Sequence, residues 1–175
     1  MITKSQELTT VDSLGYSAEN IVAFFSKKVL DTELVNSPLK IKQKVIKLAI
    51  IAQGYYLGYF GKKLFDDNIF AFKYGPMLKI RNDIVYEGIS PDKKAIFNNH
   101  HELELLEKVW DAYGEKTGIE LSALLSSDNH YWIHHWNYAI HQASQIKNIS
   151  KDEIDRITTI PDRYIENFYR NLIKE

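Results

Sequence analysis

The feature that most constrains this fold is a long segment, residues 38–60, that is predicted to form a single helix. Ser37 and Pro38 indicate its start, because a Ser side chain accepts orphan amide hydrogens and Pro is tolerated in the first turn. Gly61 is predicted to end it. The second half of the segment is apolar nearly all round, which is typical of a helix at the centre of a fold. We therefore expect the rest of the chain to pack around this helix.

The apolar stretch within this helix, residues 45–60, is better explained by a protein core than by a membrane. It is shorter than a bilayer crossing, and it carries Lys47 and Gln53. Residues 1–20 contain no apolar stretch of the kind found in secretory signals. These observations predict a cytoplasmic protein with no membrane partner.

Gly54 and Gly58 lie four residues apart on one side of the same helix. Glycine lowers helix propensity, so two glycines at this spacing predict that another backbone packs closely against them. The central helix should therefore have one face on which another element packs unusually closely.

Outside this helix, the first part of the chain predicts a leader and one short β-ribbon. Residues 1–16 are polar and aperiodic and predict a flexible leader, which leaves residues 17–175 as a single domain. Residues 69–72 are strand-like and follow a turn signal, which indicates the ribbon. Gly75 and Pro76 predict a chain break before a modest helix over residues 77–86, with a loop to follow over residues 88–99.

Further helices complete the prediction, and together they define the fold class. The predicted class is mainly α (α+β), a compact helical domain around a central hydrophobic helix, with one short β-ribbon. Two other predicted helices run from Ser17 to Leu30 and from His101 to Tyr113. Two more follow the capping boxes Thr117/Glu120 and Ser150/Glu153, and another begins near Asp128. The last predicted helix begins at Pro161 and has Tyr164, Ile165, Phe168 and Leu172 on one face.

Composition excludes several functional classes. The 175 residues include no cysteine, which excludes disulfide scaffolds, Cys-ligated metals and Cys nucleophiles. With 22 basic and 23 acidic residues the net charge is −1, so a protein that coats nucleic acid by charge alone is not expected. The 11 tyrosines exceed what a dry core can use, so we expect some of them on a recognition surface.

Three histidines are the candidates for a metal site. His130 and His134 are spaced i, i+4, and His134 and His141 are spaced i, i+7, so all three could share one helix face. The H-E-x-x-H pattern is absent and nothing supplies a further ligand, so an aromatic amphipathic helix explains the same residues. No nucleophile, base and orienting group occur together, and we expect no catalytic residue and no cofactor.

Charge is distributed unevenly along the chain. Residues 34–65 contain six lysines and no acid, whereas residues 101–128 contain seven acids and two lysines. The acidic helix is expected to lie opposite the basic one, or both faces are solvated. The alternative is that a lysine face with Lys40, Lys44 and Lys47 meets an acidic partner or RNA phosphates.

Five short motifs occur in a fixed order along most of the chain. In order they are K-x-x-K-L at 44–48, A-Q-G at 52–54, G-x-x-L-F at 61–65, A-F-x-x-G-P-M at 71–77, and L-S-x-L at 121–124 followed by Trp132. This ordered set resembles the Panacea domain, the SocA-like antitoxin family, over about Ser17 to Ala143.

The chain also departs from the family pattern. Ile51 stands where the family has an aromatic residue, Phe72 replaces a Trp, and Tyr131 replaces the Pro of a Pro-Trp pair. The usual Thr-His pair after L-S-x-L is Leu125-Ser126 here, so the family His is missing. The changed segment after the L-S-x-L motif is expected to affect the choice of partner more than the fold.

The resemblance implies a binding protein. Panacea domains are typically antitoxins encoded beside diverse toxins, often in bacteria and their phages, and neutralise them by direct contact. A SocA-like member also acts as an adaptor that delivers its toxin to an ATP-dependent protease. The expected partner is thus a cognate protein toxin. The residues expected to contact it are Tyr55, Tyr56, Phe72, Lys73, Tyr74, Gly75, Pro76 and Trp132. For each of them, the alternative is a place in the protein core.

Overall fold

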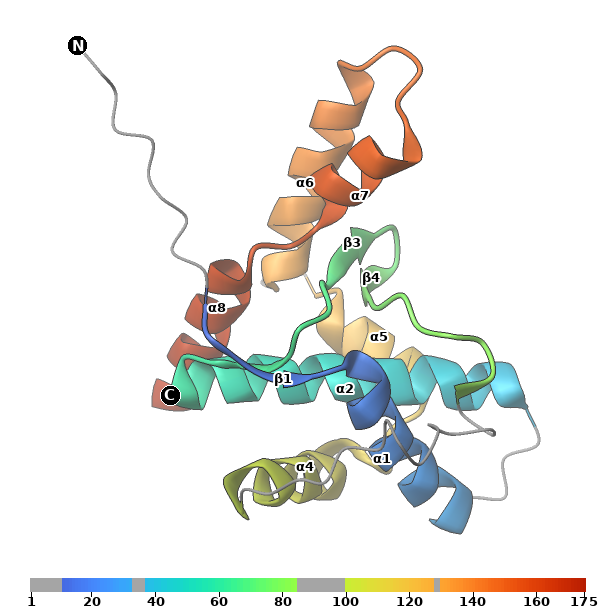
Figure 1. The fold of residues 1–175 in the computed structure, drawn as a ribbon, viewed down its shortest axis with the longest axis vertical. Helices are drawn as coiled ribbons and strands as arrows, with labels where there is room; N and C mark the ends of the chain where they lie inside the picture. The colour runs from blue at the N-terminus through green and yellow to red at the C-terminus, as the bar shows by residue number, and fades with distance from the viewer. Residues whose placement is uncertain (1–10, 33–36, 85–99, 128–129) are drawn as a thin grey trace.

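The computed structural model describes residues 11–32, 37–84, 100–127 and 130–175. Within them the fold is helical with a few short strands (Figure 1), which confirms the predicted class. The elements in chain order are β1 (Ser13–Tyr16), α1 (Ala18–Thr32), α2 (Pro38–Phe60), β2 (Lys63–Phe65), β3 (Phe70–Phe72), β4 (Gly75–Met77), α4 (His100–Tyr113), α5 (Gly118–Leu125), α6 (Tyr131–Ser144), α7 (Lys151–Thr158) and α8 (Asp162–Lys174).

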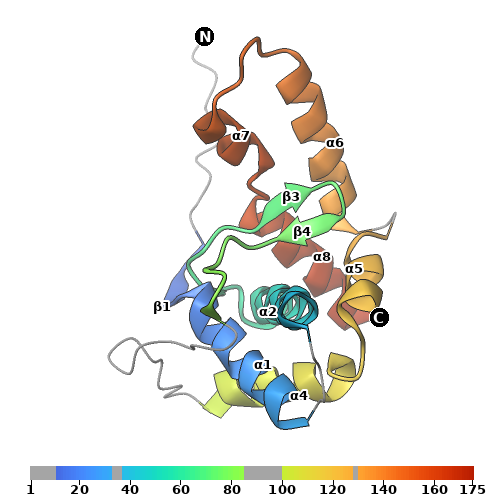
Figure 2. The ribbon, with the colours of Figure 1, turned by 90° about the vertical axis from the view of Figure 1, so that its right-hand side faces the viewer.

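Helix α2 is the centre of the fold, as its apolar sequence predicts. Figure 2 shows it nearly end-on, with α1, α4, α5 and α8 around it, and each of these helices contacts it. Its predicted bounds are confirmed: Pro38 is in the first turn, and Gly61 ends the helix in the left-handed region at φ 63°. Ser37 occupies the capping position without a side-chain capping hydrogen bond, so that part of the prediction is wrong. Within the described residues, no helix is long and apolar enough to span a membrane.

The two glycines of α2 receive helix α8. The predicted close approach of another backbone is confirmed at Gly58, whereas the neighbour of Gly54 is a side-chain ring. A Cβ atom on residue 54 would overlap the Tyr169 ring, 2.5 Å from Cδ2 and closer still to Cε2 and Cζ. A Cβ atom on residue 58 would lie 3.0 Å from the backbone carbon of Tyr169 and 2.8 Å from Cδ1 of Ile173. Any larger residue at these positions would hold the two helices apart.

Two small sheets flank α2. Strand β1 pairs with β2 in parallel, and β3 pairs with β4 as an antiparallel hairpin. The predicted flexible leader is therefore wrong for residues 13–16, which are held by a strand distant in sequence. Gln53 of α2 supports β2: its Nε2 donates to the Phe65 carbonyl at 3.0 Å, and its Oε1 accepts the Leu64 amide hydrogen at 2.7 Å.

The helix predicted after the Gly75–Pro76 break is wrong over its first part. Residues 75–77 form strand β4, in which Met77 is paired with Phe70, and residues 78–81 have no regular structure. Cross-strand pairing therefore determines the conformation of Met77, because the ladder includes the first residue of the predicted helix. The predicted loop over residues 88–99 lies outside the described residues.

Helices α6 and α7 stand away from the body of the domain as a pair, with the β3–β4 hairpin between them and α2 (Figure 1). His135 links the pair through its Nε2, 2.9 Å from the Ile157 carbonyl oxygen. Both predicted capping boxes are confirmed. The predicted face of α8 is partly wrong: the residues buried there are Ile165 and Tyr169, whereas Tyr164 and Leu172 are exposed.

Candidate functional site

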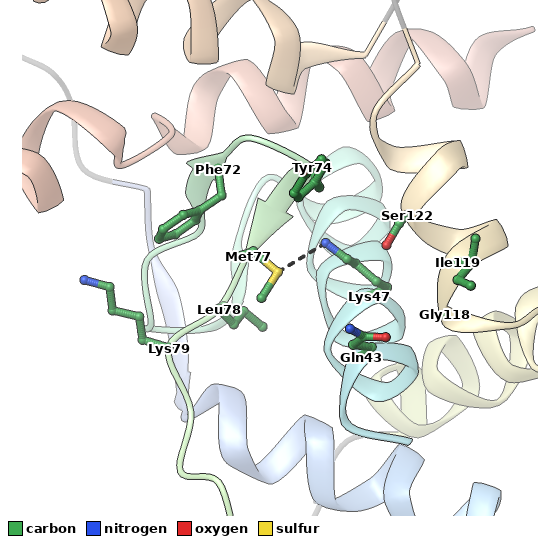
Figure 3. A pocket seen from close by; sticks show the side chains of 10 residues that line it. All are labelled: Gln43, Lys47, Phe72, Tyr74, Met77, Leu78, Lys79, Gly118, Ile119 and Ser122. Atoms are coloured by element: carbon green, nitrogen blue, oxygen red, sulfur yellow. Dashed lines mark hydrogen bonds between the residues drawn. The ribbon is translucent and has the colours of Figure 1, made fainter. Parts of the chain in front are cut away.

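A pocket of about 620 Å³ opens between α2, the β3–β4 hairpin and α5 (Figure 3). Three elements distant in sequence form it, because the hairpin and α5 both pack against α2. The residues that line it are Gln43, Lys47, Phe72, Tyr74, Met77, Leu78, Lys79, Gly118, Ile119 and Ser122.

Lys47 of α2 is the buried cation of this pocket, with only 3% of its surface exposed. Its Nζ donates to the Pro76 carbonyl at 2.6 Å and lies 3.3 Å from the sulfur of Met77. Burial disfavours the charged form and lowers the pKa of Lys47 to about 8. Its ammonium group is still mostly charged at neutral pH.

The turn of the hairpin depends on Gly75 and Pro76, both of which are buried. Gly75 has φ 116°, a backbone conformation that other residues rarely adopt. A Cβ at this position would lie 3.6 Å from Cβ of Ser126 and 3.7 Å from Nζ of Lys47. The Gly-Pro pair therefore shapes the hairpin and supplies the carbonyl that Lys47 binds, but it offers little surface to a partner.

The rim of the pocket is apolar and exposed. Tyr74 at the hairpin tip is 75% exposed, and Ile119 at the start of α5 is 78% exposed. Phe72 is also exposed, on the hairpin side of the pocket, and the ammonium group of Lys73 lies 5.3 Å from the centre of the Tyr74 ring. Large apolar side chains exposed together in this way are typical of an interaction site.

Trp132 supports the hairpin from behind rather than forming surface. It is 5% exposed, and its Nε1 donates to the Phe72 carbonyl at 2.7 Å. Tyr56 is buried as well, and Tyr55 packs in an edge-on contact against Tyr169. Of the predicted contact set, Phe72 and Tyr74 therefore line the pocket at its surface, and Lys73 is exposed beside Tyr74. Tyr56, Gly75, Pro76 and Trp132 are buried.

Ile119 and Ser122 of α5 line the pocket and were missed as site residues from the sequence. The available signal was Ile119, a large apolar residue in the first turn of the helix that the Thr117/Glu120 capping box begins. Gln43 and Lys79 carry no comparable signal, since their place in the pocket depends entirely on tertiary packing.

The predicted lysine face on α2 is not formed as one surface. Lys40 is exposed, but Lys44 and Lys47 are buried, and Nζ of Lys44 lies 5.5 Å from the Trp110 ring of α4. The acidic helix α4 therefore packs against the basic helix, as one interpretation of the charge pattern predicted.

The three histidines also lie in different surroundings. His130 is a buried helix cap whose Nδ1 accepts the Trp132 amide hydrogen at 3.4 Å, whereas His134 and His141 are exposed. His130 precedes the first turn of α6, so helical spacing does not align it with the other two. Among the described residues, no group of three or more His, Asp or Glu side chains is placed to hold a metal ion.

The fold and the pocket thus define a helical domain with exposed apolar side chains around one pocket. A family model, described as the antitoxin SocA-like, Panacea domain, matches residues 45–174, which is 130 of the 175 residues. The chain belongs to this family. No curated protein and no solved structure matches the chain.

Proposed function

We propose that this chain is the antitoxin of a type II toxin–antitoxin system and neutralises a cognate protein toxin in the cytoplasm by direct binding. The observation that carries the proposal is the convergence of family motifs on one pocket. Lys47 comes from K-x-x-K-L, Phe72 and Tyr74 from A-F-x-x-G-P, and Ser122 from L-S-x-L. Motifs separated by up to 75 positions meet there, with an exposed apolar rim around them.

The chemistry of the pocket favours binding over turnover. A tyrosine and an isoleucine stand out at the rim, and aromatic residues supply a large share of the binding energy in protein interfaces. The surface we propose for the toxin comprises Phe72, Lys73 and Tyr74 of the hairpin together with Ile119 of α5. Trp132 contributes by holding the hairpin in place.

The test uses co-expression with the protein encoded by the neighbouring gene. Wild-type chain should rescue growth and co-purify with that protein. Tyr74→Ala should weaken the complex by about 2 kcal/mol, or about thirtyfold in Kd, because it removes an exposed aromatic anchor. Tyr164→Ala is the matched control, since Tyr164 is 54% exposed on α8 and does not line the pocket.

Absence of both rescue and co-purification would contradict the proposal, and equal effects of the two Tyr→Ala variants would contradict the proposed surface. A parallel measurement of toxin lifetime separates two modes of action. Toxin that disappears only when an ATP-dependent protease is present identifies the chain as a proteolysis adaptor. Toxin that persists in an inactive complex identifies sequestration.

A further inference from the structure

Lys47 has few hydrogen-bond partners for a buried lysine. Within the described part of the chain, its ammonium group meets one carbonyl oxygen and one thioether sulfur, and no carboxylate. A thioether is a weak acceptor, so only one of the three ammonium hydrogens has a strong partner. Buried charges in proteins are normally paired, because an unpaired buried charge is costly.

The surroundings of Lys47 favour an anion. Among the described residues that line the pocket there are two lysines, Lys47 and Lys79, and no Asp or Glu. Lys79 lies at the edge and forms an ion pair with Asp155 of α7, whereas Lys47 has no acidic partner in the part of the chain that the structure describes. Figure 3 shows the Lys47 side chain reaching from α2 toward Met77 of the hairpin.

The walls around this cation are apolar. Phe72, Met77 and Leu78 line the hairpin side of the pocket, and Ile119 lines the side of α5. The volume of about 620 Å³ is larger than a single side chain, and it lies within the range of pockets that bury a ligand. The pocket therefore matches a group that has an apolar body and one negative charge.

We propose that this pocket receives a segment of the protein toxin in which an apolar side chain lies next to a carboxylate, and that the carboxylate binds Nζ of Lys47. The inference rests on the proposed antitoxin function and specifies the partner chemistry at the same site. Charge complementarity supports it, because the bound carboxylate pairs the buried ammonium. An RNA phosphate fits less well, since the walls are apolar and offer few polar donors to a sugar-phosphate backbone.

The first experiment requires no toxin. The minimal probe is 3-phenylpropionate, an apolar ring with a carboxylate, and its matched control is the neutral 3-phenylpropanamide. Both are titrated into ¹⁵N-labelled protein, and the amide signals of Gly75, Ile119 and Ser122 are followed. The carboxylate should bind about tenfold more tightly than the amide, because a hydrogen bond to a charged group is the stronger one.

Lys47→Met should abolish this preference, whereas Lys40→Met, an exposed lysine on the same helix, should leave it unchanged. Lys47→Arg keeps the positive charge and should retain part of the preference for the carboxylate. This variant separates the effect of losing the charge from the effect of losing the fold. Equal binding of the two probes to wild type, no binding of either, or a preference that persists in Lys47→Met would each overturn the proposal.

The second experiment uses the protein encoded by the neighbouring gene and identifies the source of the carboxylate. Lys47→Met should weaken its complex by about tenfold or more. The pocket could prefer the carboxylate probe while wild type and Lys47→Met bind the toxin equally well. That result would overturn the assignment of the carboxylate to the toxin and would indicate a free carboxylate ligand. No toxin binding by wild type would overturn the proposed function itself, while the probe titration would still report on the pocket.

Discussion

The contact between α2 and α8 leads to a prediction for Gly54→Ala. Its Cβ would lie 2.5 Å from Cδ2 of Tyr169, well inside the 3.5–4.0 Å at which carbon atoms pack favourably. The ring has little room to withdraw, because Tyr169 is 3% exposed and packs on Tyr55 with ring centres 4.9 Å apart. The substitution must therefore push α8 away from α2.

The expected magnitude is the difference between two effects. Overpacking of a core costs about 3 kcal/mol at a tight site, and replacing a helical Gly by Ala returns about 1 kcal/mol of helix propensity. Gly54→Ala should therefore lower the free energy of unfolding by about 2 kcal/mol. For a chain of this size, that corresponds to a drop in Tm of about 4–8 °C.

Urea denaturation followed by circular dichroism measures this change, and the slope with denaturant should stay constant. The matched background is Tyr169→Ala, which removes the ring. There, Gly54→Ala should stabilise the protein by about 1 kcal/mol, so the double-mutant cycle should give a coupling energy of about 3 kcal/mol. A stabilising effect of Gly54→Ala in the wild-type background, or a coupling energy near zero, would refute the reasoning.

Two further predictions concern the region around α6. Burial lowers the pKa of His130 to about 4 from about 6.5, so its contribution to stability is present above pH 6.5 and is lost as the pH falls toward 4, by up to about 3 kcal/mol. His130→Asn keeps a capping acceptor but does not titrate in this pH range. The urea midpoints at pH 7 and pH 4.5 should therefore differ less for this variant than for wild type. An unchanged difference would contradict the assignment of the pH dependence to His130. Trp132→Phe removes the donor to the Phe72 carbonyl and should cost about 1 kcal/mol, with faster hydrogen exchange at the hairpin and weaker toxin binding than wild type. Unchanged exchange in the hairpin would show that Trp132 does not support it.

The central helix was predictable because its signals are local. Pro38 and Gly61 act on their own turns, and the apolar second half requires burial whatever surrounds it. The two glycines indicated a close contact, and the structure supplies the neighbour, Tyr169. The two capping boxes were predictable for the same reason, since each lies within four residues.

The surroundings of the expected contact residues were predictable only in part. Phe72 and Tyr74 line the pocket and are exposed, but the burial of Trp132 and the contribution of Ile119 could not be derived from spacing. Burial depends on which elements pack together, and one sequence does not reveal whether an aromatic residue is core or surface.

The sequence by itself thus determined the central helix, its glycine contact face and the mainly helical class, because helix signals and apolar periodicity act over a few residues. Tertiary structure alone decided that residues 13–16 form a strand, that the chain after Gly75 continues as a hairpin, and that Lys47 is buried beneath an apolar pocket. Strand pairing and burial join residues far apart in the chain, and local pattern carries no information about that partnership.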